Sequence, residues 1–135
     1  MADAGQDRLY IVGGHDCSYS RAEVYYYQVS SNQWHHHSNM PWSGRHDNAA
    51  GIITQKTGER WIVVGKGSEH GHIIYWNIDT NSGWHHVTNL YGNYPHRFMH
   101  IVSLTPYTAF MLGGWTERDS FDIQNFWVWS PESYK

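Results

Sequence analysis

Residues 45–84 read RHDNAAGIITQKTGERWIVVGKGSEHGHIIYWNIDTNSGW, and this stretch decides the fold. Its three apolar runs, at 49–54, 61–64 and 73–78, are rich in β-branched and aromatic residues, and Gly, Asp, Asn or Ser bounds each of them. Short runs of this kind between turn-forming residues predict the strands of an antiparallel sheet. No window of the chain places apolar residues at helical spacing over three turns, so we predict an all-β protein.

The same unit recurs on both sides of this stretch. Glycine ends an apolar run at Gly13, Gly65 and Gly113, in steps of 52 and 48 residues. Trp34 and Trp84 lie 50 residues apart, and two histidines follow each of them. A period near 50 that contains several strands is typical of a propeller array, in which each repeat forms one blade.

These elements resemble the kelch repeat of β-propeller proteins. The first copy carries IVGG at 11–14, the aromatic run at 25–27, Trp34, and Met-Pro at 40–41 followed by Arg45. Later in the chain MLGG and FWVW repeat the first two elements. The resemblance covers nearly the whole chain and implies kelch-type β-propeller blades, each an antiparallel four-stranded unit.

The middle copy departs from the pattern at two places. Lys66 splits its glycine pair, and Asn77 falls where Tyr27 stands in the first copy. On the resemblance we divide the chain into a partial kelch repeat (1–44, strands b–d), a complete one (45–96) and a partial one (97–135, strands a–c).

The expected strand count is too small for a closed ring. The first repeat enters at Arg8 as a second strand with no first, and the strands expected in the first and third repeats span 8–12, 24–29, 34–37, 98–104, 109–112 and 126–129. With four strands in the middle repeat this makes ten, whereas a four-bladed ring needs about sixteen. We therefore expect a partial ring in one chain, completed by other copies, a partner chain or missing sequence.

Composition narrows the class of protein. The 135 residues are 40% apolar and include 8 Trp and 10 Tyr, which suits stacked sheets, and the net charge is −3 with no basic stripe. We expect no nucleic-acid partner. No apolar run reaches about 18 residues, so we expect no membrane span. Residues 1–7 lack a signal-peptide pattern and Cys17 is the single cysteine, which favours a cytoplasmic protein.

Loops at one end of the blades are the candidate contact surface. By resemblance these are loops 15–21, 66–72 and 115–120 and the links that end at 42–45 and 94–97. Arginine and aromatic side chains supply many interface hot spots, because they combine large buried area with directed hydrogen bonds. The candidate partner-binding residues are Arg45, Arg97, His96, Trp42, Tyr94, His15, Tyr19, Arg21, Glu69, His70, Trp115 and Arg118.

Two of these arginines have an alternative role. Arg45 and Arg97 lie 52 residues apart, and repetition at matched positions is also what a structural role predicts. In that role each would donate hydrogen bonds to loop carbonyls of a neighbouring blade.

The 11 histidines raise the possibility of a metal site. Residues i and i+2 of a strand face the same way, so His35 with His37, or His70 with His72, could present two imidazoles together. A zinc site needs three or four ligands, and no cysteine pair or carboxylate pattern supplies the rest. We therefore expect neither a metal nor another cofactor.

No complete catalytic motif occurs, so we expect a non-catalytic module for protein–protein interaction or assembly, with a protein partner and a homo-oligomer or larger complex. A carbohydrate-binding, lectin-like propeller is the alternative, because Trp42 and Trp115 could stack on the rings of a glycan. A third reading is a copper oxidase similar to galactose oxidase, which shares the kelch repeat and uses Tyr, His and a Tyr–Cys cross-link. In support of it this chain has Cys17 near Tyr19 and many Tyr and His residues, without a spacing that links them.

Overall fold

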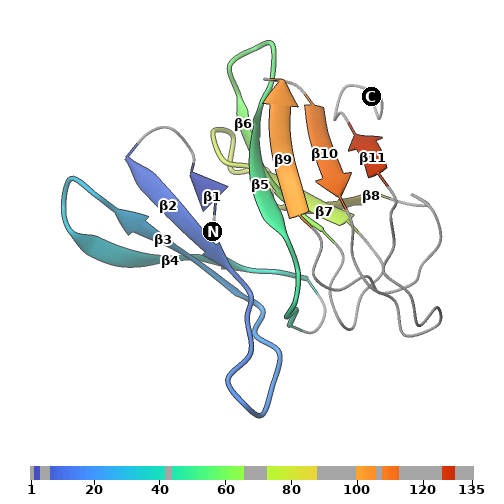
Figure 1. Cartoon of the computed structure of the whole chain (residues 1–135). Helices are drawn as coiled ribbons and strands as arrows, with labels where there is room; N and C mark the ends of the chain where they lie inside the picture. The colour runs from blue at the N-terminus through green and yellow to red at the C-terminus, as the bar shows by residue number, and fades with distance from the viewer. Residues whose placement is uncertain are drawn as a thin grey trace, which may run out of the picture.

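The chain folds into antiparallel sheets that lie side by side (Figure 1). The computed structural model describes residues 2–3, 7–41, 44–65, 73–87, 100–105, 108–112 and 126–129. These residues form eleven strands in three sheets and no helix. The predicted all-β class is confirmed, whereas the expected number of strands was ten. Each sheet falls within one of the three expected repeats.

The first sheet has the order β1-β2-β3-β4. Its strands are β1 (Ala2–Asp3), β2 (Arg8–Val12), β3 (Glu23–Gln28) and β4 (Gln33–Asn39). The expectation that this blade lacks a first strand is wrong, because β1 pairs with β2 through Ala2↔Tyr10 and Asp3↔Leu9. Two residues of low β propensity carry no alternation, so their pairing depends on the neighbouring strand rather than on their own pattern.

The second and third sheets continue the same meander. The second comprises β5 (Ala50–Thr54), β6 (Arg60–Val64), β7 (Ile73–Asn77) and β8 (Trp84–Val87). The third comprises β9 (His100–Thr105), β10 (Thr108–Leu112) and β11 (Phe126–Trp129). Strand order follows chain order in every sheet, so each pairing is a local hairpin.

The first two sheets repeat the same contacts. The ring of Tyr26 stacks on His35 with ring centroids 5.0 Å apart, and that of Tyr75 stacks on His85 at 5.3 Å. In each sheet the next cross-strand pair along ends in the repeated tryptophan. Tyr26 and Tyr75 are therefore structural counterparts, 49 residues apart.

This equivalence corrects the alignment of the middle repeat. Tyr27 pairs with the first repeated tryptophan and Trp76 with the second, so Trp76, and not Asn77, stands where Tyr27 does. The error arises at the turn before β8, where Gly83 adds one residue after Asn81. Gly83 has φ of 83°, a conformation that glycine adopts without a steric penalty.

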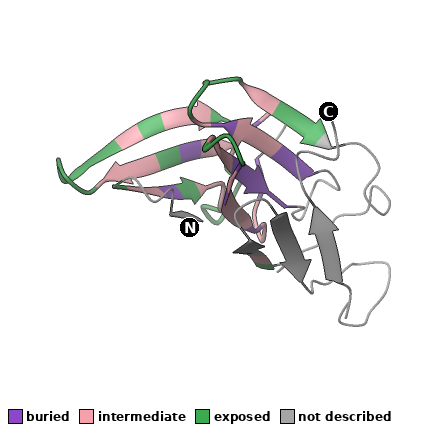
Figure 2. Cartoon of the chain, turned by 90° about the horizontal axis from the view of Figure 1, so that it is seen from above, coloured by how far each residue is buried: buried purple, intermediate pink, exposed green. Residues whose placement is uncertain are grey.

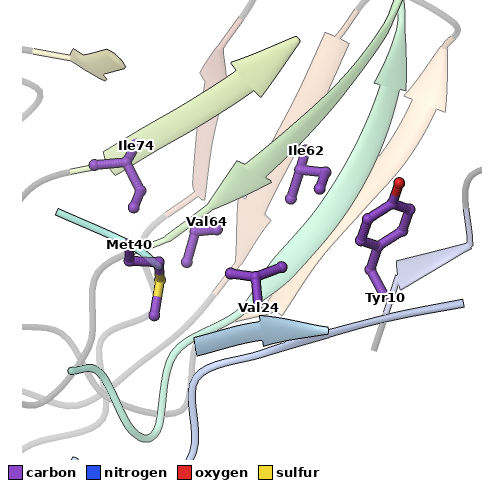
Figure 3. Packing of buried hydrophobic residues seen from close by; sticks show 6 residues of the cluster. All are labelled: Tyr10, Val24, Met40, Ile62, Val64 and Ile74. Carbon is purple, nitrogen blue, oxygen red and sulfur yellow. The ribbon is translucent and has the colours of Figure 1, made fainter. Parts of the chain in front are cut away.

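The core lies between the first and second sheets. Tyr10 and Val24 project from the first sheet toward Ile62, Val64 and Ile74 of the second, as Figure 3 shows. All five side chains are fully buried. We call the surface of a sheet that packs on the following sheet its forward face. The opposite surface, which packs on the preceding sheet, is its backward face. The forward face of the first sheet is thus covered by the backward face of the second.

The second sheet packs on the third through its own forward face. Gly51 of β5 pairs with Val63, which lies on the opposite face of the sheet from Ile62 and Val64. A Cβ atom at Gly51 would lie 2.7 Å from Cγ2 of Ile101 in β9, closer than real Cβ atoms approach. Glycine at position 51 therefore lets β9 approach the forward face of the second sheet.

Candidate interaction surface

Glycine holds together the loops that the sequence assigns to the contact surface. The amide of Gly13 donates to the carbonyl of Glu23 at 3.1 Å, and that of Gly14 donates to the carbonyl of Arg45 at 2.8 Å. Gly13 has φ of 65°, and a Cβ there would lie 2.4 Å from the Arg45 carbonyl oxygen. Any other residue would push residues 44–48 away from the first sheet.

Arg45 lies at the centre of this loop packing and not on the surface. Its side chain is 0% exposed, and Nη1 donates to the carbonyl oxygen of Gly65 at 3.1 Å. Burial lowers the pKa of Arg45 to about 10, so the guanidinium stays protonated at neutral pH. In this position the side chain of Arg45 offers no area to a partner, and its bond to Gly65 lies within the repeat 45–96. The contacts of Arg45 with the first repeat are made by its backbone, whose amide donates to the carbonyl of Arg21 and whose carbonyl accepts from the amide of Gly14.

The exposed loop before β3 carries three of the predicted contact residues, His15, Tyr19 and Arg21. Asp16 orders the loop, because one carboxylate oxygen accepts the amides of Ser18 and Tyr19 at 3.1 and 2.9 Å, and Arg21 forms an ion pair with the other. These amide hydrogen bonds, with the Arg21 charge, lower the pKa of Asp16. The loop thus presents Tyr19, which is 74% exposed, on a preformed turn.

A histidine pair lies at the base of this loop. The rings of His15 and His46 lie 4.8 Å apart, and the Ser20 hydroxyl and Nδ1 of His46 are hydrogen-bonded at 2.7 Å. The backbone amide of Cys17 donates to Nδ1 of His15 at 3.1 Å. The two contacts with His46 hold the loop against residues 44–48.

The other predicted contact residues lie outside the described residues. They are Trp42, Glu69, His70, Tyr94, His96, Arg97, Trp115 and Arg118.

A second surface, which was not predicted from the sequence, extends over one whole side of the first sheet. Side chains alternate along β2, β3 and β4, and one set faces away from the second sheet. Ile11, Tyr25 and Trp34 in this set are 37%, 41% and 55% exposed, and Figure 2 shows exposed positions along these strands. We call this surface the open face; it comprises Leu9, Ile11, Tyr25, Tyr27, Trp34 and His36.

Every position of the open face has a counterpart in the second sheet. In the same order these are Ile62, Val64, Ile74, Trp76, Trp84 and His86. Ile62, Val64 and Ile74 are 0% exposed, and Trp84 packs against the core that they share with the first sheet. The open face is therefore a blade-packing surface on which, in the described part of the chain, no blade lies.

A pocket of about 320 Å³ lies at the loop end of the open face. Its lining residues are Ile11, Gly13, Arg21, Glu23 and Tyr25. At the corresponding place on the second sheet, Met40 packs in the same cluster as Val64 and Ile74 (Figure 3). The pocket is thus the place at which the link of a neighbouring blade would insert an apolar side chain.

The histidines of β4 are packed among aromatic rings. His35 stacks on Tyr26, whereas His37 contacts Tyr10 and Trp76 edge-on at 5.5 and 4.9 Å. Among the residues that the structure describes, no three His, Cys, Asp or Glu side chains are grouped so that they could hold a metal ion. His70 and His72 lie outside those residues.

Nothing helical in the described segments is long and apolar enough to cross a bilayer.

The first sheet matches a known family model. Residues 2–41, which include all of β1 to β4, match the family model of the Kelch motif. The first sheet therefore resembles a kelch motif. Since the second sheet repeats its contacts position by position, the kelch-type blade also describes the second sheet, and the resemblance inferred from the sequence is confirmed.

Comparison with solved structures extends the likeness to the whole chain. The structure of YjhT aligns with a TM-score of 0.78 over 99% of this chain, at 12% sequence identity. Identity this low shows a shared fold and nothing about activity. The chain spans 42% of the length of YjhT. No curated protein sequence matches the chain.

Proposed function

We propose that this chain is a non-catalytic kelch-repeat propeller module for protein–protein interaction or assembly, completed by other copies, a partner chain or further sequence. The observation that carries the proposal is the open face. Its large apolar and aromatic side chains are contiguous on one side of a sheet, and an exposed apolar patch of this kind typically marks an interaction site.

The chemistry of the open face suits protein contacts. The rings of Tyr27 and Trp34 lie 5.2 Å apart, and the ring of Tyr25 lies 5.2 Å from that of His36 in an edge-on contact. Aromatic side chains of this kind bury large areas at low conformational cost and are enriched at hot spots. The adjoining pocket adds Arg21 and Glu23, which provide a charged rim.

Affinity capture with paired variants tests the proposal. The double variant Tyr25→Asp/Trp34→Asp places charge on the open face, whereas Thr57→Asp/Thr80→Asp places the same charge on exposed turn residues of the second sheet, outside that face. We expect the first variant to lose the proteins that the wild type captures from cell extract, and the second to retain them. Unchanged capture by the open-face variant, with its β-type circular dichroism intact, would contradict the proposal.

Carbohydrate binding is the second candidate, and the exposed Trp34 beside Tyr27 favours it. Aromatic faces stack on sugar rings, and the indole of Trp34 is more than half exposed. A glycan array separates the two candidates, because a saturable sugar signal that is lost in Trp34→Ala would support the lectin-like function.

A further inference from the structure

We propose that the open face of the first sheet binds the third sheet of a second copy of this chain, head to tail, so that two copies close one ring. This inference rests on the proposed function and identifies the partner. It begins from the junction between the first and second sheets, where the structure records what a backward face accepts.

That junction provides the template. The backward face of the second sheet, through Ile62, Val64 and Ile74, is covered by the forward face of another blade, together with Met40 from the link that follows it. The open face has the same positions in the same cross-strand arrangement. Surfaces with matched residues and matched pairing accept matched partners, so the forward face of a kelch-type blade is the occupant that fits.

The direction of stacking identifies which blade supplies this forward face. The first sheet covers the second, and the second packs on the third at Gly51 and Ile101, so all three sheets are stacked in one sense. Among the described sheets, the third is the one whose forward face carries no following sheet. A second copy therefore supplies the required surface in the required orientation.

Symmetry and length favour two copies over other numbers. A head-to-tail pair contains two identical junctions related by a twofold axis, so the assembly closes instead of growing into a filament. The three sheets that the structure describes in each copy give six blades, within the usual range of about four to eight. One copy spans 42% of the length of YjhT, so two span 84% of it and three would exceed it.

The charged rim distinguishes this junction from the internal one. The pocket of the open face carries Arg21 and Glu23, with Nη1 and Oε1 3.5 Å apart, and Arg21 also pairs with Asp16. These groups lie at the loop end, at the edge of the proposed contact, where water can still reach them. The apolar centre of the face, at Ile11, Tyr25 and Trp34, is left free to pack.

The molar mass of the full chain, measured by light scattering over a range of concentrations, tests the inference. We expect 31.6 kDa, twice the 15.8 kDa of one chain, at high concentration. Tyr25→Asp/Trp34→Asp should halve this mass, and the matched control Thr57→Asp/Thr80→Asp, at exposed turn residues of the second sheet, should keep it. A wild type that stays at 15.8 kDa, a mass that rises without limit, or a dimer that survives the open-face change would each overturn the two-copy ring.

Tyrosine acetylation of the wild type gives a second readout that needs no folded variant. Tyr25 lies on the open face and Tyr19 in an exposed loop. Raising the protein concentration should protect Tyr25 and leave the labelling of Tyr19 unchanged, and equal labelling at all concentrations would overturn the inference. A monomer that still loses partner capture through Tyr25→Asp/Trp34→Asp would refute self-association while leaving the proposed function standing.

Discussion

The first and second sheets share a plan, yet the same positions have different environments. Tyr25 and Ile74 are counterparts, and so are Trp34 and Trp84, but the first member of each pair is exposed and the second packs in or against the core. The difference comes from the neighbours and not from the strands, which pair in the same register. A kelch-type blade therefore has two apolar faces. A face that packs on another blade stabilises the fold, and a face of the same kind that stays exposed is available to bind a partner.

The largest test of this comparison is truncation at matched positions. Ile74→Ala removes a fully buried side chain and leaves a cavity, and we expect a loss of about 3 kcal/mol in the free energy of unfolding. In dilute protein, Tyr25→Ala should cost less than about 1 kcal/mol, because its ring faces water. Urea unfolding followed by circular dichroism measures both, and equal losses would show that the two faces do not differ in the way described.

A second test concerns the buried arginine at the start of the second repeat. Arg45→Ala removes a charged donor to the Gly65 carbonyl, and we expect a loss of about 2 kcal/mol. Arg21→Ala, which removes an exposed arginine of the same region, should change the unfolding free energy by less than about 0.5 kcal/mol. If Arg45→Ala unfolds at the wild-type urea midpoint, the hydrogen bond from Arg45 to Gly65 does not contribute to stability.

The two repeated tryptophans give a smaller contrast. Nε1 of Trp84 donates to Oγ of Ser38 at 3.2 Å, across the junction of the two sheets. Trp84→Phe should cost about 1 kcal/mol, whereas Trp34→Phe in dilute protein should have almost no effect on unfolding. The reverse order of the two losses would contradict the assigned equivalence.

The smallest expected effect is a pH dependence at the junction. Burial, with the charges of Arg8 and His36, lowers the pKa of His37, which contacts Tyr10 and Trp76. A folded-state pKa below the unfolded value of 6.5 favours the neutral ring, so this contribution is complete above pH 6.5 and is lost as the pH falls below it. Wild-type stability should decline more steeply from pH 7 to pH 5 than that of His37→Phe, and parallel declines would exclude His37 as the cause.

The strands could be predicted from sequence because their signals are local. Arg8–Val12 and Phe126–Trp129 begin and end where the alternation and the turn residues place them. The pattern missed β1, since Ala2 and Asp3 pair only because β2 lies beside them. The prediction also shifted the middle repeat by one residue, because an insertion in a turn changes the spacing and not the pairing.

The contact surface was harder to predict, because burial depends on which sheet lies against which. Arg45 is of a residue type that is common at interfaces, yet its side chain is buried and donates to the carbonyl of Gly65. The alternation that exposes Ile11 and Tyr25 is visible in the sequence. The same alternation occurs at Val64 and Ile74, which are buried. The pattern therefore predicts which side chains share a face of the strand, but not which face stays exposed to solvent.

The additional turn residue Gly83 shows that loop length and strand pairing are separable in this fold. Between the first two blades the spacing of counterparts is 53 residues from Tyr10 to Val63, 49 from Tyr26 to Tyr75 and 50 from His35 to His85. The connections thus differ in length between the two blades, while the cross-strand pairing is the same. Loops in such a chain can lengthen or shorten independently, blade by blade, so new recognition surfaces can evolve without redesign of the interior.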